Sequence, residues 1–180
     1  RGALATDPAT GGLVYFGGPE NNQTWIWDDT DWTRLHPATT PTVNSRVNLA
    51  YDQGNDEVLL FGAGESEAET WTWNGTDWVR QDPAHNPPGR TDAMLAFDPV
   101  RGVSVLFGGR NESGYLDDTW TWDGSDWTLM SPEHRPAARG SASLSFDEAS
   151  ENMVLFGGRG KVNNCLQDTW IWDGSDWTER

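Results

Sequence analysis

The sequence contains one cysteine, one lysine and no long apolar run. These shortages exclude or argue against particular kinds of bond, partner and membrane segment. Its one cysteine, Cys165, excludes a disulfide bond within the chain. Lys161 is the one lysine among 12 basic residues, against 28 acidic residues, so the net charge is −16. A field of that sign repels phosphate backbones and argues against nucleic acid as a partner. No apolar run approaches the roughly 20 residues of a membrane-spanning helix, so no membrane span is expected.

Tryptophan, in contrast, is abundant and regularly placed. The 12 tryptophans form four triplets, and consecutive triplets start 46, 49 and 50 residues apart. The triplets are Trp25, Trp27 and Trp32; Trp71, Trp73 and Trp78; Trp120, Trp122 and Trp127; and Trp170, Trp172 and Trp177. A period of about 50 residues indicates a repeat protein. We expect all the indoles to fill the structural core between repeats, rather than to form a stacking platform for sugars or peptides.

Each repeat contains four short segments typical of β-strands. The first ends in aspartate, and the second is an apolar run followed by two small residues. The third carries Trp-x-Trp, whose indoles share a face because side chains alternate along a strand. A tight turn such as Asp123-Gly124-Ser125 and a strand beginning Asp-Trp complete the repeat. The first segments are 2–7, 47–52, 93–98 and 142–147, and the second are 13–16, 58–61, 103–107 and 153–156.

The order arginine, small-residue strand, apolar run, Gly-Gly, variable loop, aromatic residue, turn and tryptophan resembles the kelch repeat. The resemblance covers essentially the whole chain in four copies. It implies an all-β fold, a β-propeller made of four kelch-like blades, each a four-stranded antiparallel sheet. We expect one propeller domain or propeller segment over residues 1–180, with blades at 1–45, 46–89, 90–138 and 139–180. Two departures from the kelch pattern are a shorter final turn and tryptophan where tyrosine is usual, at Trp27, Trp73, Trp122 and Trp172.

Comparison of the four copies separates connections of constant length from connections of variable length. The phenylalanine before the glycines always lies nine residues after the first-strand aspartate, whereas the next loop holds 5, 6, 9 and 10 residues. In an up-and-down blade these variable loops and the interblade linkers share one rim, and such loops commonly carry function. The expected binding rim is chiefly 110–116 and 159–166. The candidate binding residues are Arg46, Arg90, Arg110, Tyr115, Arg139, Arg159, Lys161, Asn163 and Asn164.

Three of these candidates have a competing structural role. Arg46, Arg90 and Arg139 begin repeats. In kelch propellers that this chain resembles, such arginines can line the channel mouth and hold acidic peptides. An ion pair with the strand-end aspartate of a neighbouring blade is the favoured interpretation.

Metal binding and catalysis have little support in the sequence. His85 and His134 occupy matching linker positions, but linker histidines are usually solvated, and no metal is expected. A kelch-type copper oxidase needs a cross-linked Tyr–Cys pair, which Tyr15 in a core strand and Cys165 in a variable loop do not suggest. We expect no catalytic residue and no cofactor.

The sequence therefore predicts a non-enzymatic interaction scaffold that binds a protein or polymer partner through the variable rim. An alternative is a self-assembling unit whose blade faces pair with copies of itself, for example two chains making eight blades, or an array. Tryptophan-lined faces at both ends of an open arc would favour that alternative. Either a homo-oligomer or a segment of a longer propeller is expected, and the non-catalytic part of an oxidase is the least favoured interpretation.

Overall fold

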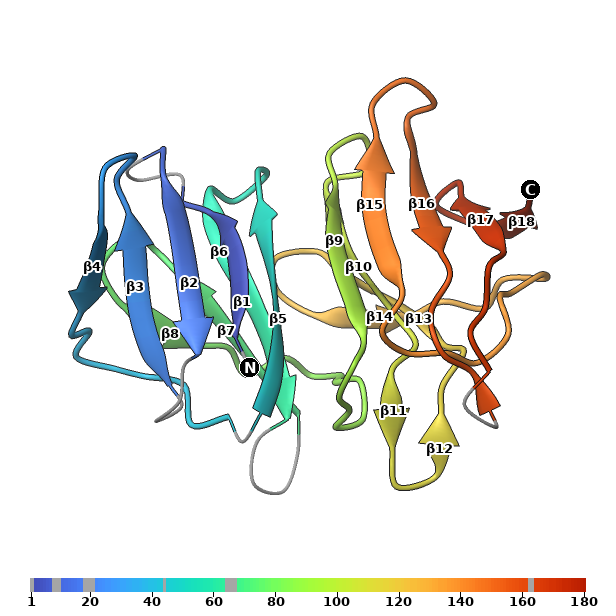
Figure 1. The fold of residues 1–180 in the computed structure, drawn as a ribbon, viewed down its shortest axis with the longest axis horizontal. Helices are drawn as coiled ribbons and strands as arrows, with labels where there is room; N and C mark the ends of the chain where they lie inside the picture. Colours follow the sequence, from blue (N-terminus) through green and yellow to red (C-terminus); the bar gives the residue numbers. More distant parts are fainter. Residues whose placement is uncertain (1, 8–10, 18–21, 44, 64–67, 162–163) are drawn as a thin grey trace.

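The computed structural model describes residues 2–7, 11–17, 22–43, 45–63, 68–161 and 164–180. These residues form four four-stranded antiparallel sheets, one in each repeat (Figure 1). Sheet 1 consists of β1 (Ala3–Thr6), β2 (Leu13–Gly17), β3 (Gln23–Trp27) and β4 (Trp32–Leu35). Sheet 2 consists of β5 (Ser45–Asp52), β6 (Glu57–Ala63), β7 (Ala68–Trp73) and β8 (Trp78–Arg80).

Sheets 3 and 4 repeat this pattern. Sheet 3 consists of β9 (Met94–Asp98), β10 (Val103–Phe107), β13 (Thr119–Trp122) and β14 (Trp127–Leu129). Its long loop contains a small hairpin of β11 (Arg110–Asn111) and β12 (Gly114–Tyr115). Sheet 4 consists of β15 (Ser143–Asp147), β16 (Asn152–Phe156), β17 (Thr169–Trp172) and β18 (Trp177–Glu179). The predicted all-β class is confirmed, and the repeated sheets with tryptophan clusters fit a repeat protein of the β-propeller type.

The first strands of the four sheets lie next to one another in chain order. β1 packs against β5, β5 against β9, and β9 against β15. Residues from all four strands line one open hollow of about 320 Å³. Alanine or serine lines the hollow from each strand, at Ala5, Ala50, Ala96 and Ser145. No helix in the described ranges is long and apolar enough to cross a membrane.

One contact recurs wherever two sheets meet. The indole of Trp78, at the start of β8, donates from Nε1 to the Oγ1 of Thr24 in sheet 1 at 2.9 Å. The same indole meets the ring of Phe16 edge to face, with centroids 5.2 Å apart. Phe16 and Thr24 are register partners on β2 and β3, so they lie side by side and contact the same indole. Equivalent contacts join Trp127 to Thr70 and Phe61, and Trp177 to Thr119 and Phe107.

Burial of the tryptophans follows from these junctions. Seven are buried, namely Trp71, Trp73, Trp78, Trp122, Trp127, Trp172 and Trp177. Four more are half-buried, namely Trp25, Trp27, Trp120 and Trp170. Trp32 is 38% exposed, so the expectation of a core position does not hold for it. Within the described residues, sheet 2 packs against the opposite face of sheet 1, and no other sheet packs against the face that carries Trp32.

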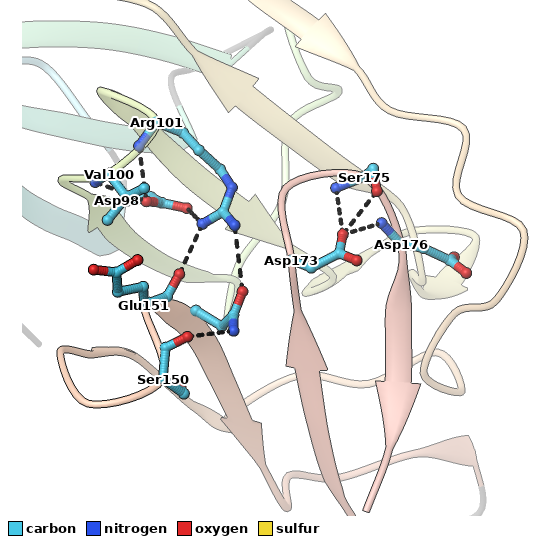
Figure 2. Close-up of polar contacts among 9 residues, drawn as sticks. Asp98, Val100, Arg101, Ser150, Glu151, Asp173, Ser175 and Asp176 are labelled. Atoms are coloured by element: carbon cyan, nitrogen blue, oxygen red, sulfur yellow. Dashed lines mark hydrogen bonds and ion pairs between the residues drawn. The ribbon is translucent and has the colours of Figure 1, made fainter.

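Turns at one rim form a second set of contacts between neighbouring sheets, through side-chain hydrogen bonds (Figure 2). Asp98 ends β9, and its carboxylate accepts a hydrogen bond from the guanidinium of Arg101 at 2.8 Å. That guanidinium also donates to the backbone oxygen of Glu151 and to Oδ1 of Asn152, both in the β15–β16 hairpin of sheet 4. It lies against Gly174 in the β17–β18 turn, where an added Cβ would clash with the Arg101 Nε. The constant-length turns therefore share one rim, as predicted.

Removing one hydroxyl acceptor tests the sheet junction. Thr70→Val keeps the side-chain shape but leaves the buried Nε1–H of Trp127 without its acceptor. We expect the free energy of unfolding in guanidinium chloride to fall by about 1–3 kcal/mol. The control is Thr76→Val, which alters an exposed side chain of the same sheet. An unchanged stability for Thr70→Val, or an equal loss in both variants, would contradict the role given to the hydroxyl.

Candidate functional site

The variable loops of sheets 3 and 4 form the rim opposite the strand-connecting turns. In Figure 1 the β11–β12 hairpin projects from the edge away from the β15–β16 turn. Two backbone hydrogen bonds between Thr91 and Arg110, of 2.8 and 2.7 Å, fix the base of this hairpin. The Arg110 side chain is exposed, and its guanidinium carbon lies 5.9 Å from the centroid of the Tyr115 ring. Such a cation–π contact holds the arginine in place while its charge stays accessible.

The loop of sheet 4 is held in the same way. Arg159 and Gly140 exchange two backbone hydrogen bonds of 3.0 and 2.8 Å. The backbone of Arg159 also forms an antiparallel β-bridge with Cys165. The side chains of Arg159, Lys161 and Asn164 are exposed. The rim therefore combines a fixed backbone with exposed cations, on a chain whose net charge is −16.

Two loops of different sheets meet at this rim. Arg139 donates its backbone N–H to the carbonyl of Leu116 at 3.0 Å, and its own carbonyl accepts from Gly109 at 2.8 Å. An open hollow of about 450 Å³ lies beside the hairpin, lined by Ala63, residues 89–91 and residues 110–113. Sequence reasoning did not find this hollow, because its lining comes from three segments that are distant in the chain.

Arg90 and Arg139 are not part of the exposed surface, which corrects their place among the candidate binding residues. Their relative exposures are 2% and 0%. Arg90 binds Asp118 through both terminal nitrogens and donates to the Gly108 carbonyl at 3.0 Å. Arg139 binds Asp168 in the same way, at 2.6 and 2.7 Å.

These ion pairs also differ from the predicted ones. The partner aspartate comes from the variable loop of the same repeat, not from the strand end of a neighbouring one. Each aspartate also accepts the indole N–H of the first tryptophan of the pair, Trp120 or Trp170. The signal in the sequence was the spacing Asp-x-Trp, present in repeats three and four. The side chain of Arg46 and the whole of Asn163 lie outside the described part of the structure.

Electrostatics keeps both loop aspartates ionised. Hydrogen bonds from Arg139 hold the pKa of Asp168 at about 2, against partial desolvation and with help from Trp170. For Asp118 desolvation raises the pKa, but hydrogen bonds and the charge of Arg90 outweigh it and leave the pKa lowered. Buried arginine without such a partner would be strongly destabilising. The pairs therefore anchor the ends of the variable loops to the sheets.

The linker histidines bind aspartate rather than standing free. His85 Nδ1 lies 2.7 Å from Asp126, and His134 Nδ1 lies 2.8 Å from Asp176. Each aspartate is in the next sheet and also accepts the backbone N–H of the same histidine. The hydrogen bond and charge of Asp176 raise the pKa of His134. Across the residues that the structure describes, no group of three or more histidine, cysteine or acidic side chains could hold a metal ion.

Comparison with known proteins shows the fold and not a family. No family model matches the chain, and neither does any curated protein sequence. Among solved structures the chain is similar to the structure of YjhT, with a TM-score of 0.63 and 12% sequence identity. The similarity covers 89% of this chain and 52% of that one. The chain thus spans about half the length of YjhT.

Acid should weaken the anchor of the sheet 4 loop. A carboxyl whose pKa is lowered on folding stabilises fully above its unfolded value of 3.8, and loses this as the pH falls through about 2. We expect the melting temperature of the wild type to fall between about pH 4 and pH 2 more steeply than that of Asp168→Asn, which already lacks the pair. The exposed Asp29→Asn variant serves as the control and should follow the wild type. Equal slopes for wild type and Asp168→Asn would contradict the assignment.

Proposed function

We propose that this protein is a non-enzymatic interaction scaffold, a propeller of kelch-like blades that binds a protein or polymer partner through its variable-loop rim. The binding rim consists of residues 110–116, 159–161 and 164–166. The observation that carries the proposal is that exposed cationic side chains stand on loops whose backbones are hydrogen-bonded to neighbouring segments.

Preorganisation supports a binding role for these loops. Long loops lose conformational entropy when a partner orders them, and a loop that is already ordered avoids that cost. Backbone pairing holds Arg110 and Arg159, and the ion pairs Arg90–Asp118 and Arg139–Asp168 hold the loop ends. The sheets thus supply a rigid base, and the loops supply side chains that differ between repeats.

The side chains of the rim indicate the chemistry of the partner. Arg110, Arg159 and Lys161 favour carboxylate or other anionic groups. Tyr115 is half-buried beside Arg110 and offers a ring edge to a flat group. Because the whole chain is acidic, these attractions act at short range and select a partner segment rather than steer a highly charged one.

The positions of Tyr15 and Cys165 differ from those of the Tyr–Cys pair in a kelch-type copper oxidase. Tyr15 belongs to β2 of sheet 1, and Cys165 belongs to the loop before β17 of sheet 4. Strands β2 and β17 lie on opposite sides of the arrangement in Figure 1. His85 and His134 are each engaged with an aspartate.

A charge-matched pair of triple variants tests the rim. Ligands are first selected on the wild type from a peptide phage library and an array of immobilised glycans. The rim variant replaces Arg110, Arg159 and Lys161 by alanine. The control variant replaces three exposed arginines elsewhere, Arg34, Arg80 and Arg180, and so changes the net charge equally.

We expect the selected ligands to bind the control variant like the wild type and the rim variant at least about tenfold more weakly, with unchanged melting temperatures. Ligands that bind the rim variant as tightly as the wild type would contradict the proposal. So would selection of no ligand above background from either source.

A further inference from the structure

Two linkers of the chain each place a histidine against the aspartate that precedes the last strand of the following sheet. The backbone N–H of His134 donates to Oδ1 of Asp176 at 2.8 Å, and its ring Nδ1 lies 2.8 Å from Oδ2 of the same carboxylate. His85 makes the same two contacts with Asp126, at 2.8 and 2.7 Å. We propose that these histidine–aspartate contacts are pH-dependent clamps, which stabilise the junction between consecutive sheets more strongly when the histidine is protonated than when it is neutral.

The position of the ring favours the protonated histidine. An ionised carboxylate has no hydrogen to donate, so the Nδ1 atom that faces it must carry the hydrogen of the bond. A protonated ring has a hydrogen on both nitrogens, whereas a neutral ring has one hydrogen and can carry it on the other nitrogen. The positive charge of the protonated ring also shortens and strengthens the hydrogen bond. Loss of the proton therefore weakens the contact between the two sheets.

The first junction provides a counterpart without a titrating ring. Thr39 occupies the same linker position as His85 and His134, seven residues after the last tryptophan of its repeat. Its backbone N–H donates to Oδ1 of Asp77 in sheet 2 at 2.8 Å. The backbone part of the clamp is thus common to the three junctions, and the histidine ring is present at the second and third.

The charged groups around His134 are mostly acidic. The hydrogen bond and the charge of Asp176 raise the pKa of His134, Glu133 of the same linker adds to the shift, and partial desolvation opposes it. Glu179 of β18 lines the same small hollow as His134. Arg135, the next residue, is the one arginine of the linker 130–138. These surroundings favour the charged form of the ring.

The charged groups around His85 are fewer and also acidic. Asp126 faces the ring from the next sheet, and Asp82 is the one charged residue of the linker 81–89. On β14 the position that corresponds to the glutamate of β18 holds Leu129. The two clamps therefore share their contacts and differ in the charges nearby.

The aspartates of the clamps stay ionised across the range in which histidine titrates. The hydrogen bonds of the histidine rings lower the pKa values of Asp126 and Asp176. Asp123 and Asp173, in the same turns, also have lowered pKa values, chiefly through hydrogen bonds from the backbone N–H groups of these aspartates. A change in the clamps between about pH 5 and pH 9 therefore comes from the histidines.

The sign of the pH dependence follows from the raised pKa of His134. The stabilisation is fully present below the ordinary value of 6.5 and is lost as the pH rises through the raised value. The side chains of His85 and His134 are 72% and 64% exposed, so solvent screens both contacts. The expected effect is accordingly modest.

Hydrogen exchange of the indole N–H groups measures each junction separately. The Nε1–H groups of Trp127 and Trp177 report on the two junctions with a clamp, and that of Trp78 reports on the junction without one. Exchange is followed by NMR on the 180-residue chain between about pH 5.5 and pH 9. Division by the rate of Trp78 cancels the pH dependence of the exchange chemistry itself. We expect the protection of Trp127 and Trp177, relative to Trp78, to fall roughly 1.5- to 5-fold as the pH rises.

Single substitutions identify the histidine responsible at each junction. His134→Gln should remove the pH dependence at Trp177 and leave that at Trp127, and His85→Gln should do the reverse. The matched control is His36→Gln, which removes the third histidine of the chain, in the first linker, and should change neither ratio.

A titration of the ring by NMR checks the contact itself. In the wild type the pKa of His134 should lie above 6.5, and Asp176→Asn should lower it. Three results would overturn the proposal. The first is a pKa of His134 at or below 6.5. The second is a wild type whose protection ratios do not change with pH, and the third is the same pH dependence at Trp177 in His134→Gln as in the wild type.

Discussion

An indole inserted between two sheets, with its ring against phenylalanine and its N–H on a threonine hydroxyl, is the contact on which this structure depends. A single four-stranded sheet of this size cannot bury a core by itself. Tryptophan offers the largest apolar area of any side chain, and the threonine satisfies the polar atom that burial would otherwise leave unpaired. Because the same contact recurs at each junction, stability accumulates from neighbour to neighbour along the chain.

Further hydrogen bonds and ion pairs lie at the two rims, and they have a different role at each rim. At the turn rim, Arg101 ties the first turn of sheet 3 to two hairpins of sheet 4. At the loop rim, buried arginines form ion pairs with aspartates at the loop ends of the same repeat. The rest of each loop differs in length and sequence between repeats. The arginines of these pairs are buried and doubly hydrogen-bonded to partly exposed aspartates, so their role is to fix loop geometry rather than to meet a ligand.

Much of this arrangement could be predicted from the spacing of residues. The tryptophan period indicated the repeats, and strand alternation placed each Trp-x-Trp pair on one face. The pattern could not show that Trp32 is exposed, because its spacing equals that of Trp78 while burial depends on a neighbouring sheet. The partners of Arg90 and Arg139 were missed for another reason. Their aspartates lie two residues before the first tryptophan of the pair, but the same position is glutamine in repeat one and glutamate in repeat two, so no shared residue type marked it.

The linkers make contacts between consecutive repeats that neither repeat shows alone. His134 is exposed, as expected of a linker residue, and it also bonds to Asp176, which precedes the last strand of the next sheet. Two clues were separate in the sequence, a matched histidine in two linkers and an aspartate before every final tryptophan. Only the stacking of sheets brings them together, and the match holds at two consecutive junctions.

Hydrogen exchange of the indole N–H groups, followed by NMR, tests the central contact most directly. The Nε1 protons of Trp78, Trp127 and Trp177 donate to buried threonine hydroxyls in the structure. These three protons should exchange only when neighbouring sheets separate, and should therefore be protected by orders of magnitude relative to a free indole. Exchange of any one of them at the rate of a free indole would contradict the account, because that junction would then be open in solution.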